Sequence, residues 1–168
     1  MDSIVSDTTA LIVLARQQRI AILGACFERI LLPPTVYEEW LRGDARVEDL
    51  MAQHRFLRVV ASPRGDVLEE LQALLDPGEA EAIALAKELR IPLLVDEKKG
   101  RTIARMMGIP VVGLVGVLCL AVESGVCSAA EVKAVVHKAV DSGFRLSNPL
   151  YAAFVERVDE IEGARHQR

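Results

Sequence analysis

Two aspartates stand at the ends of apolar segments that are typical of buried strands. Asp7 follows Ile4 and Val5, and Asp96 follows the apolar run 91–95. Because parallel strands have their carboxyl ends at the same edge of a sheet, we expect both carboxylates to lie at one site. Carboxylates held close together repel each other unless a cation or a shared proton relieves the repulsion. The pattern therefore predicts a site for a hard cation or for a proton-sharing pair.

A local explanation also exists for Asp7. Its side chain could accept N–H bonds from Thr9 or Ala10 and cap the helix that is expected from there. Taken alone, helix capping explains the presence of Asp7 as well as a catalytic role does. The second aspartate in a comparable position favours chemistry.

Two pairs of glutamates lie on predicted helices. Glu38 and Glu39 are neighbours, so their side chains point about 100° apart and cannot both face one pocket. Glu79 and Glu81 fall in the first turn of the helix expected over residues 78–89, where the helix dipole alone favours acids. The pattern by itself does not choose among these four glutamates.

A basic cluster opens the helix that follows Asp96. Lys98, Lys99 and Arg101 lie within five residues of that carboxylate. Beside an acidic site they are predicted phosphate contacts, whereas the simpler interpretation of such a run is a solvated helix surface.

The elements that position these residues alternate between short strands and helices. Apolar segments at residues 29–32, 57–60 and 109–112 are expected strands, the second at an edge, and helical periodicity fills the stretches between. Beyond residue 125 the chain is predicted to be helical, with a capping box at Ser128 and Glu131 and a further helix from Asn148 that ends in a frayed polar tail. We expect an α/β domain over residues 1–125 and a helical extension over residues 126–168 that packs on the same domain or on a second subunit.

Composition fits one domain with an aliphatic core. The chain has 168 residues, of which 51% are hydrophobic and 4% aromatic. Its 20 basic and 24 acidic residues give a net charge of −4, which argues against a general polyanion binder. Four acids in one metal site would leave the other charges balanced, so this charge is only weak evidence against a nuclease.

Cysteines and hydropathy indicate a cytoplasmic protein. Cys26, Cys119 and Cys127 are odd in number and lack metal-type spacing, which predicts reduced thiols. The longest uncharged run, residues 106–122, is interrupted by proline and glycine and is predicted to be a strand and a buried helix, so we expect no membrane span and no signal peptide.

Four segments, taken in order, resemble the motifs of PIN domains, and the closest match is the prokaryotic branch related to toxin–antitoxin ribonucleases of the VapC type. The segments are Val5 to Leu11, Pro33 to Glu39, Gly78 to Ala86 and Leu93 to Arg101. The resemblance runs from about residue 3 to residue 120. It rests on the order of the segments more than on any single motif.

This resemblance implies a three-layer α/β/α sandwich with a parallel sheet of four to five strands and extra C-terminal helices. It also implies an acid cluster that binds Mg²⁺ or Mn²⁺, and the matching positions are Asp7, Glu39, Glu79 and Asp96. For the third position, Glu79 is favoured over Glu81. Alanines follow Glu79 five and seven residues on, as they follow the family's acid. The family commonly has aspartate at this third position, so the longer side chain is a departure.

The activity that the resemblance implies is metal-dependent endonucleolytic cleavage of single-stranded RNA, as the toxin of a toxin–antitoxin pair. Lys98, Lys99 and Arg101 would contact RNA phosphates, and an antitoxin protein and a second copy of the chain are the other expected partners. The alternative is a PIN-like module that binds RNA or an antitoxin without cleaving.

Other α/β classes fit the residues less well. A phosphatase-like domain needs an acid two residues beyond the first aspartate, where Thr9 stands, and a receiver needs paired acids that Ser6 and Asp7 do not supply. No G-x-G-x-x-G motif follows a predicted strand, which argues against a dinucleotide-binding fold.

Overall fold

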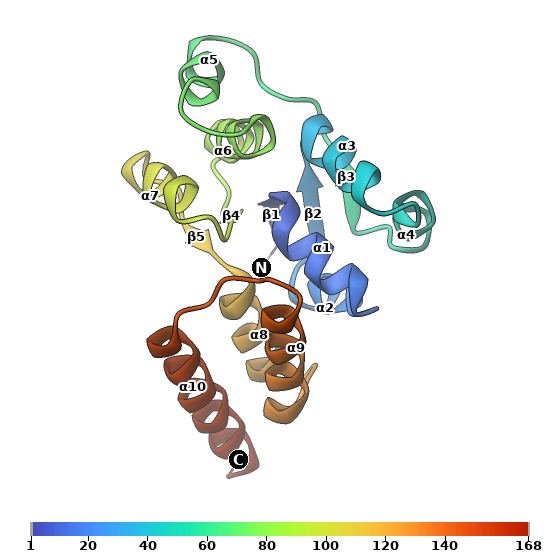
Figure 1. Ribbon diagram of the computed structural model, residues 1–168, viewed down its shortest axis with the longest axis vertical. Coiled ribbons are helices and arrows are strands. Elements are labelled where there is room, and N and C mark those ends of the chain that lie inside the picture. Colours follow the sequence, from blue (N-terminus) through green and yellow to red (C-terminus); the bar gives the residue numbers. More distant parts are fainter. Residues whose placement is uncertain (1, 168) are drawn as a thin grey trace.

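A five-stranded parallel sheet forms the centre of the computed structural model, which describes residues 2–167. The strands are β1 Ser3–Ser6, β2 Arg29–Leu32, β3 Leu57–Val59, β4 Leu93–Leu94 and β5 Val111–Val112. Their order is β3-β2-β1-β4-β5, so β1 is the central strand and β3 an edge strand (Figure 1). The predicted parallel sheet is confirmed.

Strands β4 and β5 are shorter than the sequence pattern predicted. Pro92 and Pro110 stand just before them and have no N–H to donate, although their carbonyls accept bonds from Val5 and Leu93 respectively. Regular strand pairing therefore begins only after each proline, and Ile91 and Ile109, which precede the prolines, lie outside the strands.

Helices join the strands and continue beyond them. Their bounds are α1 Thr8–Arg16, α2 Ala21–Cys26, α3 Pro34–Gly43, α4 Val47–Gln53, α5 Asp66–Gln72, α6 Pro77–Leu89, α7 Lys98–Met106, α8 Leu114–Glu123, α9 Ala129–Asp141 and α10 Asn148–His166. The capping box predicted at Ser128 and Glu131 is present at the start of α9.

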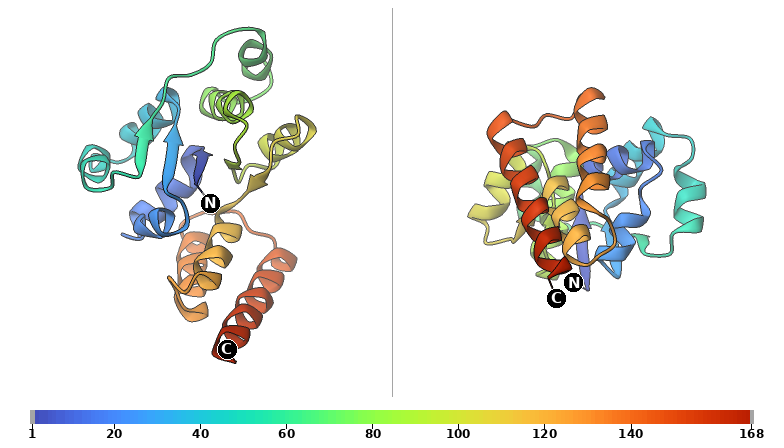
Figure 2. Two further views of the ribbon diagram at one scale, coloured as in Figure 1. Left: turned by 180° about the vertical axis from the view of Figure 1, so that it is seen from behind. Right: turned by 90° about the horizontal axis from the view of Figure 1, so that it is seen from below.

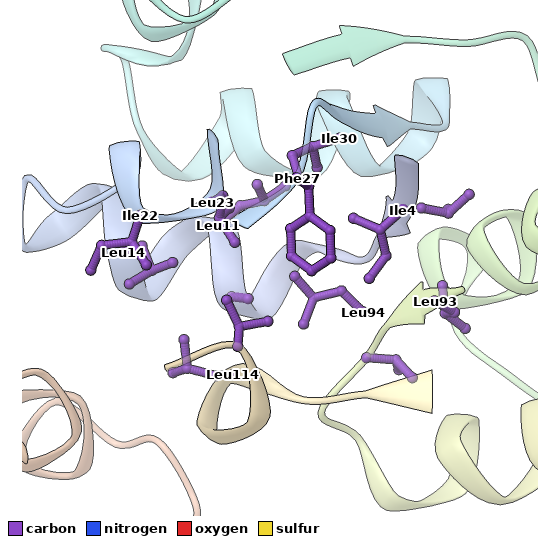
Figure 3. Close-up of a cluster of buried hydrophobic side chains, with 14 of the residues drawn as sticks. Ile4, Leu11, Leu14, Ile22, Leu23, Phe27, Ile30, Leu93, Leu94 and Leu114 are labelled. Carbon is purple, nitrogen blue, oxygen red and sulfur yellow. The ribbon is translucent and has the colours of Figure 1, made fainter. Parts of the chain in front are cut away.

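The two faces of the sheet are covered by different helices. Leu94 lies beside Phe27, on the side of the sheet where Leu114 of α8 lies (Figure 3). Helix α6 contacts both β1 and β4. Helix α6 packs against α3, α5 and β1, in agreement with its apolar residues all round. These layers make the predicted α/β/α sandwich, with an aliphatic core.

The C-terminal helices pack on the same chain. Helices α9 and α10 both contact α8 and lie together at one end of the molecule (Figures 1 and 2). The polar tail does not fray as predicted, because the side chain of Arg165 donates to the Val122 carbonyl at 3.1 Å. The predicted apolar face of α10 is only partly buried, since Leu150 and Tyr151 are 51% and 37% exposed. Residues 2–167 contain no helix with the length and apolar character needed to cross a membrane.

Truncation of Leu94 should destabilise the sheet at the point where it carries Asp96. The side chain of Leu94 is fully buried, so Leu94→Ala should lower the free energy of unfolding by about 2–5 kcal/mol, measured by urea denaturation. As the control, Val59→Ala on edge strand β3, where Val59 is 45% exposed, should change it by no more than about 0.5 kcal/mol. Equal losses in both variants would contradict this description of the core.

Candidate active site

Asp7 is the first residue after the central strand. Its N–H donates to the Leu94 carbonyl at 3.0 Å, which extends the pairing of β1 with β4, and the residue is only 4% exposed. Its Oδ1 accepts from the N–H of Thr9 at 3.2 Å, so Asp7 also caps α1. The local and the chemical explanations of this residue are therefore compatible.

Asp96 lies at the end of the neighbouring strand. Because Ser6 pairs with Leu94 in a parallel register, the two aspartates leave the sheet at the same edge. Oδ1 of Asp96 accepts from the N–H of Leu114 at the start of α8, at 2.9 Å. Oδ2 is buried and has no hydrogen-bond partner, which leaves an acceptor free for a ligand.

Glu39 approaches the same region from α3. Its Oε2 accepts from the Thr8 hydroxyl at 2.8 Å, which ties the glutamate to the residue next to Asp7. Glu38 is exposed, as expected for one member of an adjacent pair. Thr8 therefore orients Glu39, a contact that the sequence pattern did not reveal.

The structure gives Glu79 and Glu81 different surroundings. Oε2 of Glu81 accepts from the N–H of Thr35 at 3.0 Å, so this side chain satisfies the first turn of α3. Oε1 of Glu79 is buried and has no hydrogen-bond partner. These contacts support the choice of Glu79 as the third acid of the site.

The acids influence one another electrostatically. Burial, and then the charge of Asp96, holds the pKa of Asp7 well above its usual range, and the charges of Glu79 and Glu39 raise it further. Burial also raises the pKa of Asp96 to about 6. Burial, followed by the charges of Glu97, Asp76 and Glu39, raises the pKa of Glu79. The structure thus concentrates carboxylates where their charged forms are disfavoured.

Glycines make room for three of these carboxylates. A Cβ at Gly78 would lie 2.5 Å from Oε2 of Glu39, and one at Gly100 would lie 2.5 Å from Oε1 of Glu79. A Cβ at Gly113 would lie 2.7 Å from Oδ1 of Asp96. At contacts this short something must shift, and the ends of the Glu39 and Glu79 side chains can give way, so a side chain at these glycines would displace the carboxylates.

The predicted phosphate contacts lie in two different places. Lys98 is exposed and lines a groove beside Asp96, and Arg101 lines the same groove while its Nη1 donates to the Val95 carbonyl at 3.3 Å. The ammonium of Lys99 donates instead to the Leu74 carbonyl, beyond the end of α5. Two of the three predicted cations therefore share a surface with the acid site.

The residues present fit a hard divalent cation by their chemistry. All four acids offer carboxylate oxygens, and two buried oxygens, one each from Glu79 and Asp96, have no hydrogen-bond partner. Within the described residues no group of three or more acids, histidines or cysteines stands close enough to hold a metal directly. Carboxylate oxygens are the ligands that a hard divalent cation takes from protein side chains.

Comparison with protein families agrees with this fold. A family profile described as a PIN domain matches residues 3–160. Among solved structures, a PilT N-terminus domain protein from the hyperthermophilic archaeon Sulfolobus solfataricus P2 has a TM-score of 0.44 and 16% identity, with 70% of this chain and 90% of that chain covered. Comparison with curated proteins finds no match. The matched residues include all four acids and most of α10.

The raised pKa of Asp96 predicts how stability varies with pH when divalent ions are removed by a chelator. The folded protein keeps a proton on this carboxyl up to about pH 6, whereas an ordinary aspartate loses it near 3.8. The free energy of unfolding therefore has its full contribution from Asp96 below about pH 4, and this contribution is lost as the pH rises to about 6. Asp96→Asn should flatten this dependence and make the protein more stable than wild type at pH 7.5, by on the order of 1–3 kcal/mol.

Urea denaturation from pH 4 to 8 measures the effect of this variant, in which the amide oxygen can still accept from Leu114. Glu38→Gln is the control, because Glu38 is exposed and its substitution should leave the pH profile unchanged. A uniform loss of stability at every pH in Asp96→Asn would show that no ionisation penalty exists at this site.

Proposed function

Because this chain belongs to the PIN domain family, for which a nuclease-type function is expected, we propose that it is a metal-dependent endoribonuclease that cleaves single-stranded RNA. The observation that supports the proposal most strongly is the placement of Asp7 and Asp96 at one buried edge of two neighbouring strands. Open α/β sheets bind their ligands at this edge, where the strand order reverses. Here that reversal lies between β1 and β4.

We infer that Asp7, Glu39, Glu79 and Asp96 would hold the cation. When bound, Mg²⁺ or Mn²⁺ would supply a hard Lewis acid that offsets charge on a phosphodiester and lowers the pKa of water. A cation at this position would also relieve the repulsion that raises the pKa of Asp7. The free lone pairs of Asp96 and Glu79 support this assignment.

The chain's own groups position the acids and the substrate. The N–H groups of Thr9 and Leu114 fix the orientation of Asp7 and Asp96, and the Thr8 hydroxyl fixes Glu39. Arg101 lies close enough to Asp96 to lower its pKa, so its guanidinium could meet a phosphate that approaches this carboxylate. Glu39 and Glu79 would accept protons and hydrogen bonds from water in the site.

Finer features of the function rest on the sequence resemblance. We propose that the chain acts as a toxin with a protein antitoxin, that it forms a homodimer and that it works in the cytoplasm. A module that binds RNA or an antitoxin without cleaving is the alternative, and the longer reach of Glu79 in place of the family's usual aspartate is what favours it.

Removal of the Asp7 carboxylate should abolish cleavage. With a labelled single-stranded RNA and Mn²⁺, Asp7→Asn should reduce the cleavage rate about 100-fold or more, because a buried charged group at the reacting phosphate is lost. Excess chelator should have a comparable effect on the wild-type protein. Gel analysis of the products measures both.

The control for this experiment is Glu38→Gln, which removes an exposed carboxylate beside Glu39 and should leave the rate unchanged. Cleavage that persists in Asp7→Asn and in chelator would refute the proposed metal-dependent nuclease. RNA binding by the wild-type protein without cleavage would establish the binding-module alternative.

Displacement of the Glu39 carboxylate should lower the cleavage rate without lowering the stability of the fold. Gly78→Ala puts a methyl group against the Glu39 carboxylate but favours the helix conformation of α6, so the free energy of unfolding should stay level or rise by up to about 1 kcal/mol. The cleavage rate should fall about 10- to 100-fold, since misplaced catalytic groups are costly. Gly43→Ala, also on a helix but with nothing within 4 Å of the added carbon, is the matched control. Equal rates in the two variants would exclude a role for Glu39 in the site.

A further inference from the structure

A groove of about 600 Å³ extends from the acid site toward the C-terminal helices. Asp96 lies in its wall and is the one acidic lining residue in the described part of the chain. Its basic lining residues are Lys98, Arg101, Arg105 and Arg145. A surface of this charge stands out in a chain whose net charge is −4.

One wall of the groove is a face of α7. Lys98, Arg101 and Arg105 are separated by three and four residues, so they lie along one side of this helix. The other wall comes from the loop between α9 and α10, which contributes Arg145 with Phe144 and Leu146. Figures 1 and 2 show this loop passing close to the start of α8.

The cations of the groove form no salt bridge with another residue among residues 2–167. Within the described residues, the salt bridges involve other basic side chains, and none of them includes a groove residue. Lys98, Arg105 and Arg145 are exposed, and the apolar residues that line the groove include Val111, Val112 and Val115. Cations contributed by two segments of the chain, beside apolar lining residues, suit a strand that carries phosphates at its edges and flat bases between them.

We propose that this groove binds the part of a single-stranded RNA that lies on one side of the cleavage site, with Arg105 and Arg145 holding phosphates from opposite walls. The inference rests on the proposed nuclease function and adds the path of the substrate to it. The loop between α9 and α10 then contributes to RNA binding, and the C-terminal helices set the position of Arg145.

Binding of a labelled single-stranded RNA to the cleavage-deficient Asp7→Asn protein tests the proposal. Fluorescence anisotropy over a series of KCl concentrations gives Kd and its salt dependence. Arg105→Ala combined with Arg145→Ala should raise Kd about tenfold or more, and should make the slope of log affinity against log salt shallower by about 0.7 for each cation removed. Replacement of both arginines by lysine should restore most of the slope.

Arg58→Ala combined with Arg64→Ala is the matched control, because both arginines are exposed and lie on or just after β3, at the opposite edge of the sheet. An unchanged Kd and slope in the variant that lacks Arg105 and Arg145 would overturn the proposal that RNA binds in this groove. Loss of cleavage in Asp7→Asn would still support the nuclease proposal in that case. If the Asp7→Asn protein does not bind RNA but binds a poly-glutamate peptide through Arg105 and Arg145, the RNA-binding proposal would be overturned in favour of an acidic protein partner.

Discussion

Repulsion between buried carboxylates is the constraint around which this structure is arranged. Asp7 is almost fully buried, and the charge of Asp96 is the second largest cause, after burial, of its raised pKa. Two helices begin at this edge of the sheet and direct N–H groups at the acids, from Thr9 to Asp7 and from Leu114 to Asp96. These bonds lower the pKa of each aspartate but do not cancel the effect of burial. A cation at the site would remove the remaining cost.

The glutamates are added to this pair by helix packing. Helix α3 packs against both α1 and α6, and this arrangement puts Glu39 within reach of Thr8 and beside Gly78. Glycine at the contacts lets the helices and the strand ends approach the carboxylates closely. Hydrogen bonds from backbone N–H groups and from Thr8 therefore orient three of the acids, and the glycines leave the space that the carboxylates occupy.

The C-terminal part of the chain belongs to this arrangement through α8. The same helix whose first N–H bonds to Asp96 supplies the surface on which α9 and α10 pack. Hydrogen bonds from Arg165 to Val122 and from the Ala129 N–H to Glu162 hold α10 in place. The acid site and the C-terminal helices thus share one element, which fixes the loop that carries Arg145 relative to Asp96.

The sequence by itself determined the parallel sheet, nearly all of the elements and the two aspartates at adjacent strand ends. Apolar periodicity and an acid after a strand are local signals, and both survive in the fold. Only the tertiary structure gave Glu79 and Glu81 different surroundings. Glu81 accepts from Thr35 at the start of α3, whereas the Glu79 carboxylate lies against Gly100 of α7. The same holds for Thr8, for the glycines under the carboxylates and for Arg145 opposite α7. Each of these depends on a contact between segments distant in the chain, and such contacts leave no periodic mark on the sequence.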